Sequence, residues 1–379
     1  MAVAKIILAD TESNRDLFYA TRTPLHDPHL FVDIDGETFV FGNPLEAGRL
    51  KKAKLIDHVL DPNEYLEMGQ GHMRRARKYR TQNSGALILH ALLKAHGVKR
   101  VLIPKLFNVP IAKGLEDLQY TVAEDANMYP ERQVKTAAEV KHIQDAVERT
   151  EEAIWIAYEI LSNSIIQKDR TLVHLGNVVT AEMLKGAMGA YLIKFGYLAR
   201  DTIVAPGIQA CDPHEQGHGP IRANELIVID IFPGSMEHGY YADISRTFLK
   251  GKPSERQAAM YAAVLDAQLK AEAIFRPGVA IRSAYERAME VLTEAGFETE
   301  HDIKKGPYGF FHGLSHGLGL AVHDPISQTE PLVAGNVISN EPGLYYPDDG
   351  GVRLEDDILI TSGGSKNLCS FPKDNWIIA

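Results

Sequence analysis

Residues 226–249 read LIVIDIFPGSMEHGYYADISRTFL, and this stretch decides how the second half of the chain folds. Two apolar runs flank a turn rich in glycine and proline, a pattern typical of two strands joined by a hairpin. Each run carries one aspartate among apolar neighbours, Asp230 in the first and Asp243 in the second. A buried carboxylate without a partner costs several kcal/mol, so both acids need a nearby cation.

A second pair of strand-like runs follows near the C-terminus, VISNEPGLY (337–345) and VRLEDDILIT (352–361). These runs carry Glu341 and Glu355 at places comparable to the two aspartates. Two segments with helical spacing precede each pair of runs, at about 136–163, 180–196, 254–275 and 280–295. The order helix, helix, strand, strand therefore occurs twice, which predicts two architecturally similar halves.

The first 130 residues have a different organisation. Short strand-like and helix-like segments alternate there, including a hairpin pattern in LFVDIDGETFVFG (30–42) and a helical pattern in GALILHALLKAHG (85–97) that stops at a glycine. The segment MYPERQVKT (128–136) is interpreted as a linker. We therefore predict a smaller α/β domain over residues 1–130 and an α+β domain over residues 131–379.

Composition and charge restrict the partners. The chain has 379 residues with a formal net charge of −10, which argues against nucleic acid or an anionic membrane surface as the main partner. The strongly basic stretch 72–80 is interpreted as a solvated helix face. Two cysteines make neither a disulfide framework nor a cysteine-rich metal site. Without a signal-like amino terminus or a run of eighteen apolar residues, we expect a cytoplasmic protein that does not span a membrane.

The stretch FHGLSHGLGLAVHDP (311–325) carries three histidines, His312, His316 and His323, between glycines. Glycine weakens a helix and permits close backbone approach, so the spacing favours a bend over one face of a helix. Three histidines within twelve residues, followed by the turn Glu341-Pro342-Gly343, indicate a catalytic cluster more than isolated core residues.

Carboxylates together with an imidazole suit Mn, Fe, Co or Zn, in a site that holds two ions about 3.5–4 Å apart. Four carboxylates can bridge two such ions, which lower the pKa of a shared water so that it attacks a carbonyl at neutral pH. The same acids are also compatible with ordinary salt bridges, with Arg246 and Arg353 as the partners of two of them. Residue types alone leave both interpretations open.

Four motifs in this order, VIDIFPGSMEHGYYADISRTF, HGLSHGLGLAVHD, SNEPGLY and GVRLEDDILIT, resemble the pita-bread metallopeptidases, which include methionine aminopeptidase, prolidase and aminopeptidase P. HGLSH is most similar to the aminopeptidase P and prolidase branch. The resemblance covers about residues 131–379, and residues 1–130 are similar to the creatinase-type N-terminal domain of that branch. It implies an α+β pita-bread fold with pseudo-twofold halves, preceded by a smaller α/β domain.

By this resemblance the chain holds two divalent metal ions, Mn first, with Co, Zn or Fe as alternatives. The implied metal ligands are Asp230, Asp243, His316, Glu341 and Glu355. Glu341 would also carry a proton from the bridging water to the leaving amine. Asp357 shares a strand face with Glu355 and is interpreted as a bystander.

The resemblance also implies residues that act on the substrate. His323 would hydrogen-bond the tetrahedral intermediate, and His312 would contact the substrate carbonyl. Arg353 would orient the carboxylate of Glu355 or bind a substrate carboxylate. A further histidine that lines the substrate pocket is expected upstream of Asp230, where His214 is placed better than its competitor His218.

The implied activity is that of a dinuclear-metal exopeptidase that hydrolyses Xaa-Pro bonds, either an Xaa-Pro aminopeptidase or an Xaa-Pro dipeptidase. Its substrate would be a peptide or dipeptide with proline at the second position, and the protein would form a homodimer. Two alternatives are a metal-independent creatinase-like amidinohydrolase and a non-catalytic binding protein on the same scaffold. The complete ligand set argues against both, because neither needs all five groups.

One spacing departs from the family pattern. Asp230 and Asp243 are thirteen residues apart, two more than expected, and the extra residues fall in the turn PGSMEHG (233–239). A change of two preserves which face of a strand a side chain occupies, because the side-chain period is two. We therefore expect the ligand pair to survive while the loop beside the pocket differs, which leaves the preferred side chain before proline open.

Overall fold

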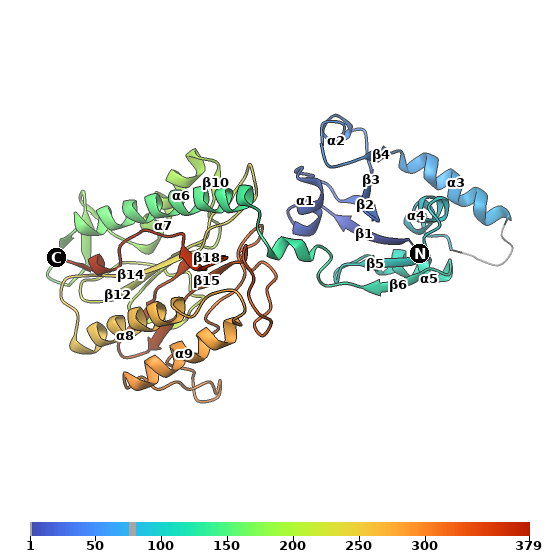
Figure 1. Ribbon diagram of the computed structural model, residues 1–379. Coiled ribbons are helices and arrows are strands. Elements are labelled where there is room, and N and C mark those ends of the chain that lie inside the picture. Colours follow the sequence, from blue (N-terminus) through green and yellow to red (C-terminus); the bar gives the residue numbers. More distant parts are fainter. Residues whose placement is uncertain (1, 76–80) are drawn as a thin grey trace. The chain divides into compact units, whose positions relative to one another are not determined.

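A computed structural model describes residues 2–75 and 81–379 (Figure 1). Most of the basic stretch 72–80 thus lies outside the described residues. The chain divides into two compact units, Met1–Pro130 and Glu131–Ala379. In the part of the chain that the structure describes, every helix is too short or too polar to cross a membrane.

The first unit is built on one mixed sheet with helices on both faces. Its elements are β1 (Val3–Ala9), α1 (Arg15–Thr21), β2 (His29–Ile34), β3 (Glu37–Phe41), α2 (Ala47–Leu50), β4 (His58–Leu60), α3 (Pro62–Arg75), α4 (Ser84–Ala95), β5 (Arg100–Ile103), α5 (Val109–Asp117) and β6 (Thr121–Glu124). The six strands run in the order β4-β3-β2-β1-β5-β6. Side chains alternate between two cores: Ile6 packs with α4 and α5, and Ile7 packs with α1 and α2. The predicted hairpin is confirmed as β2 and β3, which pair antiparallel.

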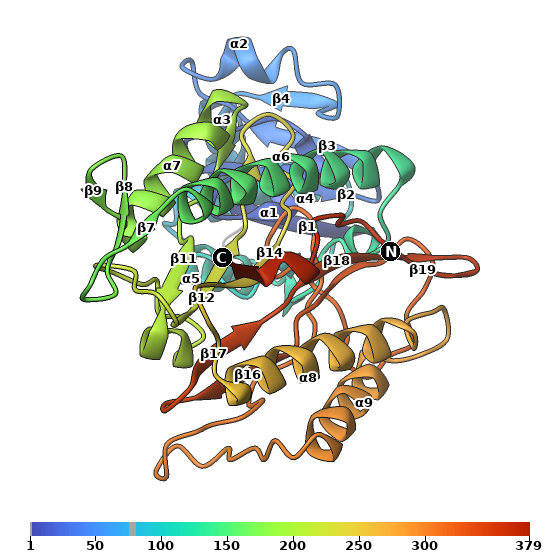
Figure 2. The same cartoon turned by 90° about the vertical axis from the view of Figure 1, so that its left-hand side faces the viewer.

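The second unit contains two helix pairs and several short sheets. Its elements are α6 (Ala137–Ser162), β7 (Ile165–Ile166), β8 (Leu172–His174), β9 (Asn177–Val178), α7 (Ala181–Lys194), β10 (Tyr197–Leu198), β11 (Ile203–Pro206), β12 (Leu226–Ile231), β13 (Gly234–Ser235), β14 (Ile244–Lys250), α8 (Glu255–Glu272), α9 (Ile281–Glu294), β15 (Val337–Asn340), β16 (Gly343–Tyr346), β17 (Gly350–Arg353), β18 (Asp356–Thr361), β19 (Gly364–Asn367) and β20 (Ile377–Ile378). Helices α6 and α7 lie on one side of the strands, and α8 and α9 lie on the other (Figure 2). The predicted order of two helices followed by two strand runs is confirmed in both halves.

The long helices of the second unit begin where their sequences supply N-caps. In α6 the Thr136 side chain accepts a hydrogen bond from the backbone N–H of Glu139, whose carboxylate accepts one from the backbone N–H of Thr136. Ser254 and Gln257 form the same capping box at the start of α8. In each helix the capping box satisfies two backbone N–H groups at the N-terminal end, so these local residues fix where the helices begin.

The two C-terminal runs each form two strands, which corrects the prediction of one strand per run. VISNEPGLY divides into β15 and β16 around Glu341, where Pro342 supplies no ladder N–H. VRLEDDILIT divides into β17 and β18 around Glu355. At each break the chain changes partner, because β16 pairs with β17 while β15 pairs with β18. Glu341 and Glu355 therefore lie where the backbone leaves one sheet for another.

Candidate active site

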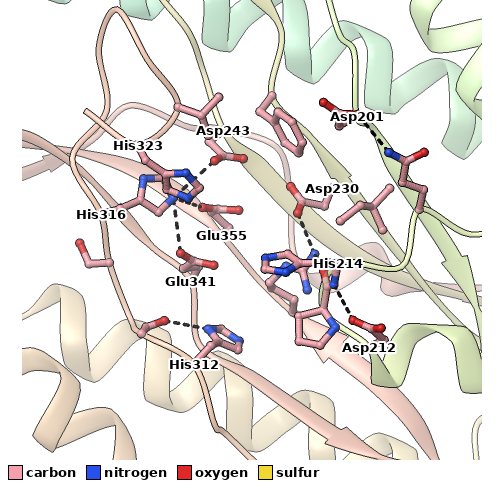
Figure 3. A pocket seen from close by; sticks show the side chains of 18 of the residues that line it. Asp201, Asp212, His214, Asp230, Asp243, His312, His316, His323, Glu341 and Glu355 are labelled. Atoms are coloured by element: carbon pink, nitrogen blue, oxygen red, sulfur yellow. Dashed lines mark hydrogen bonds and ion pairs between the residues drawn. The ribbon is translucent and has the colours of Figure 1, made fainter. Parts of the chain in front are cut away.

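A cavity of about 740 Å³ opens in the second unit (Figure 3). All the side chains predicted for the site line it: Asp230, Asp243, His316, Glu341, Glu355, His312, His323, Arg353 and His214. The competitor His218 lies outside this cavity, with 72% of its side chain exposed. Apolar side chains complete the walls, namely Ile203, Phe232, Phe311 and Val322.

The two aspartates reach the cavity from one hairpin. Strands β12 and β14 pair antiparallel with Asp230 opposite Ser245, and Asp243 immediately precedes β14. Because side chains alternate along a strand, this register places Asp230 and Asp243 on the same face of the hairpin. The longer turn between them forms the short strand β13, which pairs with β10.

His316 stands at the centre of the acidic cluster. Its Nε2 atom lies 3.5 Å from Asp243 Oδ2, 3.4 Å from Glu341 Oε1 and 3.7 Å from Glu355 Oε1. The Nδ1 atom of the same ring lies 3.1 Å from the carbonyl oxygen of Gly317. A proton on Nδ1 therefore donates to this carbonyl and leaves the lone pair of Nε2 directed at the carboxylates.

The loop that carries His316 is held along β15. The backbone N–H of His316 donates to Ser339 Oγ at 3.0 Å, and the N–H of Ser339 donates to the carbonyl of His316 at 2.9 Å. A Cβ atom at Gly317 would lie 2.4 Å from the carbonyl oxygen of Asp324. Glycine at this position thus permits the close approach that brings His316 and His323 together, with ring centroids 4.4 Å apart.

Burial and mutual repulsion make the cluster unfavourable without cations. Burial, with repulsion from neighbouring carboxylates, raises the pKa of Asp243 and of Glu355 well above the ordinary range. Burial raises the pKa of Glu341 to about 8, although Arg353 opposes the shift. Burial also lowers the pKa of His316 to about 4, so the imidazole is neutral near pH 7.

The donor atoms fit divalent metal ions. Asp230 Oδ1, Asp243 Oδ1 and Glu355 Oε1 are buried without a hydrogen-bond partner. Asp243, His316 and Glu355 each offer one ligand atom within 4.8 Å of the others. Unpaired buried oxygens of like charge around a neutral imidazole are the arrangement that a divalent cation stabilises. These residues therefore match the chemistry of a carboxylate-histidine metal site.

Arg353 is almost fully buried and binds four groups. Its Nη2 donates to Asp230 Oδ2 at 2.7 Å and to the carbonyl oxygen of Pro213 at 3.3 Å. Nε donates to Ser245 Oγ at 3.0 Å, and Nη1 donates to the hydroxyl of Tyr345 at 3.0 Å. It therefore contacts Asp230 directly, and Ser245 in turn donates to Glu355 Oε2.

The salt-bridge interpretation accordingly holds for one acid of the cluster, Asp230. Arg246, the second expected partner, instead donates to Asp356 Oδ1 at 2.8 Å, so its assignment to the cluster was wrong. Strand alternation explains the difference, because Arg246 lies on the opposite face of β14 from Ser245. Asp357 also sits behind the cluster, where its Oδ2 accepts the backbone N–H of Asp243 at 3.1 Å.

Tyr345 links His312 to Arg353 and has no distinctive signal in the sequence, because GLYY reads as an ordinary apolar strand. The Nε2 atom of His312 lies 2.8 Å from the hydroxyl of Tyr345, and its Nδ1 lies 2.7 Å from the carbonyl of Gly313. Burial lowers the pKa of His312 to about 3, so the ring is neutral. Nδ1 therefore donates to Gly313 and Nε2 accepts from Tyr345, which fixes the ring.

A buried ion-pair group supports the loop beside His323. Asp324 accepts hydrogen bonds from Arg132 and from Lys135, the latter at 3.1 Å, and all three side chains are at most 6% exposed. Two of these residues lie in segment 128–136, so its interpretation as a linker was wrong for that part. The pairs join positions 192 and 189 residues apart, which is why local sequence patterns do not predict them.

Comparisons with known proteins identify the family of this chain. The family model for metallopeptidase family M24 matches residues 141–362. An Xaa-Pro dipeptidase of Pyrococcus horikoshii is 36% identical over 242 residues, which cover 62% of this chain and 62% of that relative. The match to the Xaa-Pro dipeptidase of Pyrococcus furiosus, at 35% identity, similarly covers 62% of this chain and 63% of the relative. The chain thus matches less than two thirds of the length of these two relatives.

Other comparisons cover nearly the whole chain. An uncharacterized peptidase of Staphylococcus saprophyticus is 32% identical over 368 residues, 94% of this chain and 93% of that relative. The crystal structure of an X-Pro aminopeptidase from Thermotoga maritima superposes with a TM-score of 0.77 at 19% identity, covering 99% and 97% of the two chains. The prolidase structure from Pyrococcus horikoshii gives 0.75 at 23% identity, covering 98% and 94%. These structures share the predicted pita-bread fold, and the chain belongs to metallopeptidase family M24.

Proposed function

We propose that this protein is an exopeptidase that hydrolyses Xaa-Pro bonds with two divalent metal ions, Mn first among them. One observation carries the proposal: four carboxylates and a neutral imidazole converge on one cavity, and three of their buried oxygens have no hydrogen-bond partner. The proposed ligands are Asp230, Asp243, His316, Glu341 and Glu355. The names of the Pyrococcus relatives support the choice of an Xaa-Pro bond.

Hydrolysis adds one water across the scissile amide, so that the Xaa carboxylate and the secondary amine of proline leave. When bound, the metal ions supply a water nucleophile at neutral pH and positive charge near the carbonyl oxygen. Glu341 takes a proton from the attacking water and gives it to the proline nitrogen as the C–N bond breaks.

The remaining polar groups would position the substrate. His323 donates to the oxygen that becomes negative as the carbonyl is attacked. His312, held by Gly313 and Tyr345, orients the substrate carbonyl without carrying a charge of its own. Arg353 fixes the carboxylate of Asp230 while His214 closes one wall. The proline of an Xaa-Pro bond has no amide proton to donate and carries an apolar ring. The apolar walls of the cavity suit this ring.

We further propose a creatinase-type N-terminal domain over 1–130 and a catalytic domain over 131–379. A homodimer and a cytoplasmic location belong to the same proposal. The location is supported by Cys211 and Cys369, which are both free thiols in the structure. Sedimentation of the purified chain tests the dimer, and a monomeric mass would reject it.

The activity is tested with the purified full chain loaded with Mn. Xaa-Pro dipeptides and Xaa-Pro-Yaa tripeptides are incubated with it, and release of the first amino acid is followed. We expect turnover that disappears on exhaustive chelation and returns with Mn. His316→Ala is expected to abolish turnover, whereas the exposed Arg282→Met, on α9, serves as the control. Absence of turnover on both peptide lengths rejects the proposal, and turnover that survives chelation favours the creatinase-like alternative.

A further inference from the structure

We propose that the cavity disfavours a free C-terminal carboxylate, so that the substrate continues beyond proline and is a tripeptide or longer. This inference rests on the proposed function and states which of its two substrate lengths the site takes. It is carried by the charged groups that line the cavity and by the hydrogen bonds of its single arginine.

The cavity carries a surplus of negative charge. Its lining acids are Asp201, Asp212, Asp230, Asp243, Glu341 and Glu355. Among the described residues that line it, Arg353 is the sole lysine or arginine. Two divalent ions bring four positive charges, so the six carboxylates, the guanidinium and these ions together carry one negative charge, histidines not counted. A carboxylate that enters this space meets no surplus of positive charge.

Arg353 has few free hydrogen-bond donors for a substrate. Four donor contacts go to the protein itself, to Asp230, Ser245, Tyr345 and the carbonyl of Pro213. A guanidinium has five N–H groups, so the fork that normally grips a carboxylate with two parallel hydrogen bonds is already occupied. Release of Asp230 to free the fork would leave a buried carboxylate without its partner.

Two of the acids lie on the wall that also carries His214, away from His316 and His323. Figure 3 shows Asp201 and Asp212 on the opposite side of the cavity from His316 and His323. Asp201 Oδ1 accepts from Gln216 Nε2 at 3.0 Å, and Asp212 Oδ1 accepts the backbone N–H of His214 at 3.0 Å. Neither acid pairs with a lysine or arginine in these contacts. This wall attracts the ammonium group of a peptide and repels a carboxylate.

Peptide length decides where the substrate carboxylate lies. In an Xaa-Pro dipeptide the carboxylate belongs to the residue that follows the scissile bond, so it lies inside the cavity. Each added residue moves it outward by about 3.3–3.6 Å, toward solvent that screens it. An amide at the C-terminus removes the charge without adding a residue, which separates the effect of charge from that of length.

The test uses the full chain loaded with Mn and three substrates, Ala-Pro, Ala-Pro-amide and Ala-Pro-Ala. We expect kcat/KM for the amide and the tripeptide to exceed that for the free dipeptide by about tenfold, mostly through KM, with a smaller ratio at high salt. Equal or faster cleavage of the free dipeptide overturns this inference and leaves the proposed function standing. Cleavage of none of the three overturns the proposed function and this inference with it.

A variant of the acidic wall adds an independent readout. Asp201→Asn removes one charge and keeps the oxygen that accepts from Gln216. We expect the ratio of kcat/KM on Ala-Pro to kcat/KM on Ala-Pro-amide to rise by about two- to fivefold, because solvent screening reduces the effect of a partly solvated charge. Glu286→Gln, an exposed acid on α9, is the matched control and should leave the ratio unchanged. An unchanged ratio in Asp201→Asn contradicts the proposed role of this wall.

Discussion

Arg353→Met is the perturbation for which the structure gives the clearest magnitude. The Arg353 side chain is 4% exposed and the side chain of its partner Asp230 is 12% exposed, with 2.7 Å between Nη2 and Oδ2. Removal of one partner from a buried ion pair costs about 3–5 kcal/mol, because the other charge stays buried and unpaired. We expect the free energy of unfolding of metal-free Arg353→Met to be lower than that of the metal-free wild type by about this amount.

Metal ions should reduce the loss, because they offset the charge that Arg353 no longer neutralises. Urea titrations of the wild type and Arg353→Met, with chelator and with saturating Mn, measure both effects. The double variant Arg353→Met/Asp230→Asn should be more stable than Arg353→Met under chelation, since it no longer buries an unpaired carboxylate. Arg282→Met, with a 65% exposed side chain, should change stability by less than about 1 kcal/mol. A loss below about 1 kcal/mol in chelated Arg353→Met, or a double variant less stable than the single one, refutes the reasoning.

Three further predictions concern Glu341, Tyr345 and Asp324. In the metal-free protein the pKa of Glu341 is raised to about 8 from an ordinary 4.5, so the folded state keeps a proton that the unfolded state releases. The free energy of unfolding should therefore fall as the pH rises from about 5 to about 8. Urea titrations across this pH range measure the loss of stability, and saturating Mn should remove most of that loss. Equal stability at pH 5 and pH 8 would contradict the prediction. Tyr345→Phe should lower stability by about 1–3 kcal/mol and kcat by about tenfold, because His312 loses its donor; an unchanged kcat would show that this hydroxyl does not position the ring. Asp324→Asn should cost about 3–5 kcal/mol in urea titrations, because two buried cations lose their shared carboxylate, and it should also lower kcat through His323; wild-type stability would refute this.

The helices and the repeated order of elements were predictable because their signals are local. Thr136 and Ser254 mark helix starts within four residues of sequence, and the structure has α6 and α8 beginning directly after them. Apolar runs with single acids likewise predict β12 and β14. The strand breaks at Glu341 and Glu355 escaped prediction, because they depend on which distant strand each run pairs with.

The site was predictable in its residue types more than in its contacts. Asp230 and Arg353 are 123 positions apart, so no local pattern predicts that they pair. The sequence left a pair between Arg246 and one of the four acids equally open. Tyr345 reads as an ordinary strand residue, and its bond to His312 depends on a loop 33 positions away. Chemistry-bearing residue types are visible in a sequence, whereas the hydrogen bonds that orient them are set by tertiary packing.

Titration of the metal-free protein with metal ions tests most directly whether the acids converge on a pair of ions. Titration of the metal-free full chain with Mn, followed calorimetrically and by metal analysis after desalting, should give two ions per chain. Asp243→Asn should bind fewer ions while keeping its fold by circular dichroism. A folded wild-type chain that binds no ion, or Asp243→Asn with undiminished stoichiometry and affinity, would contradict the account.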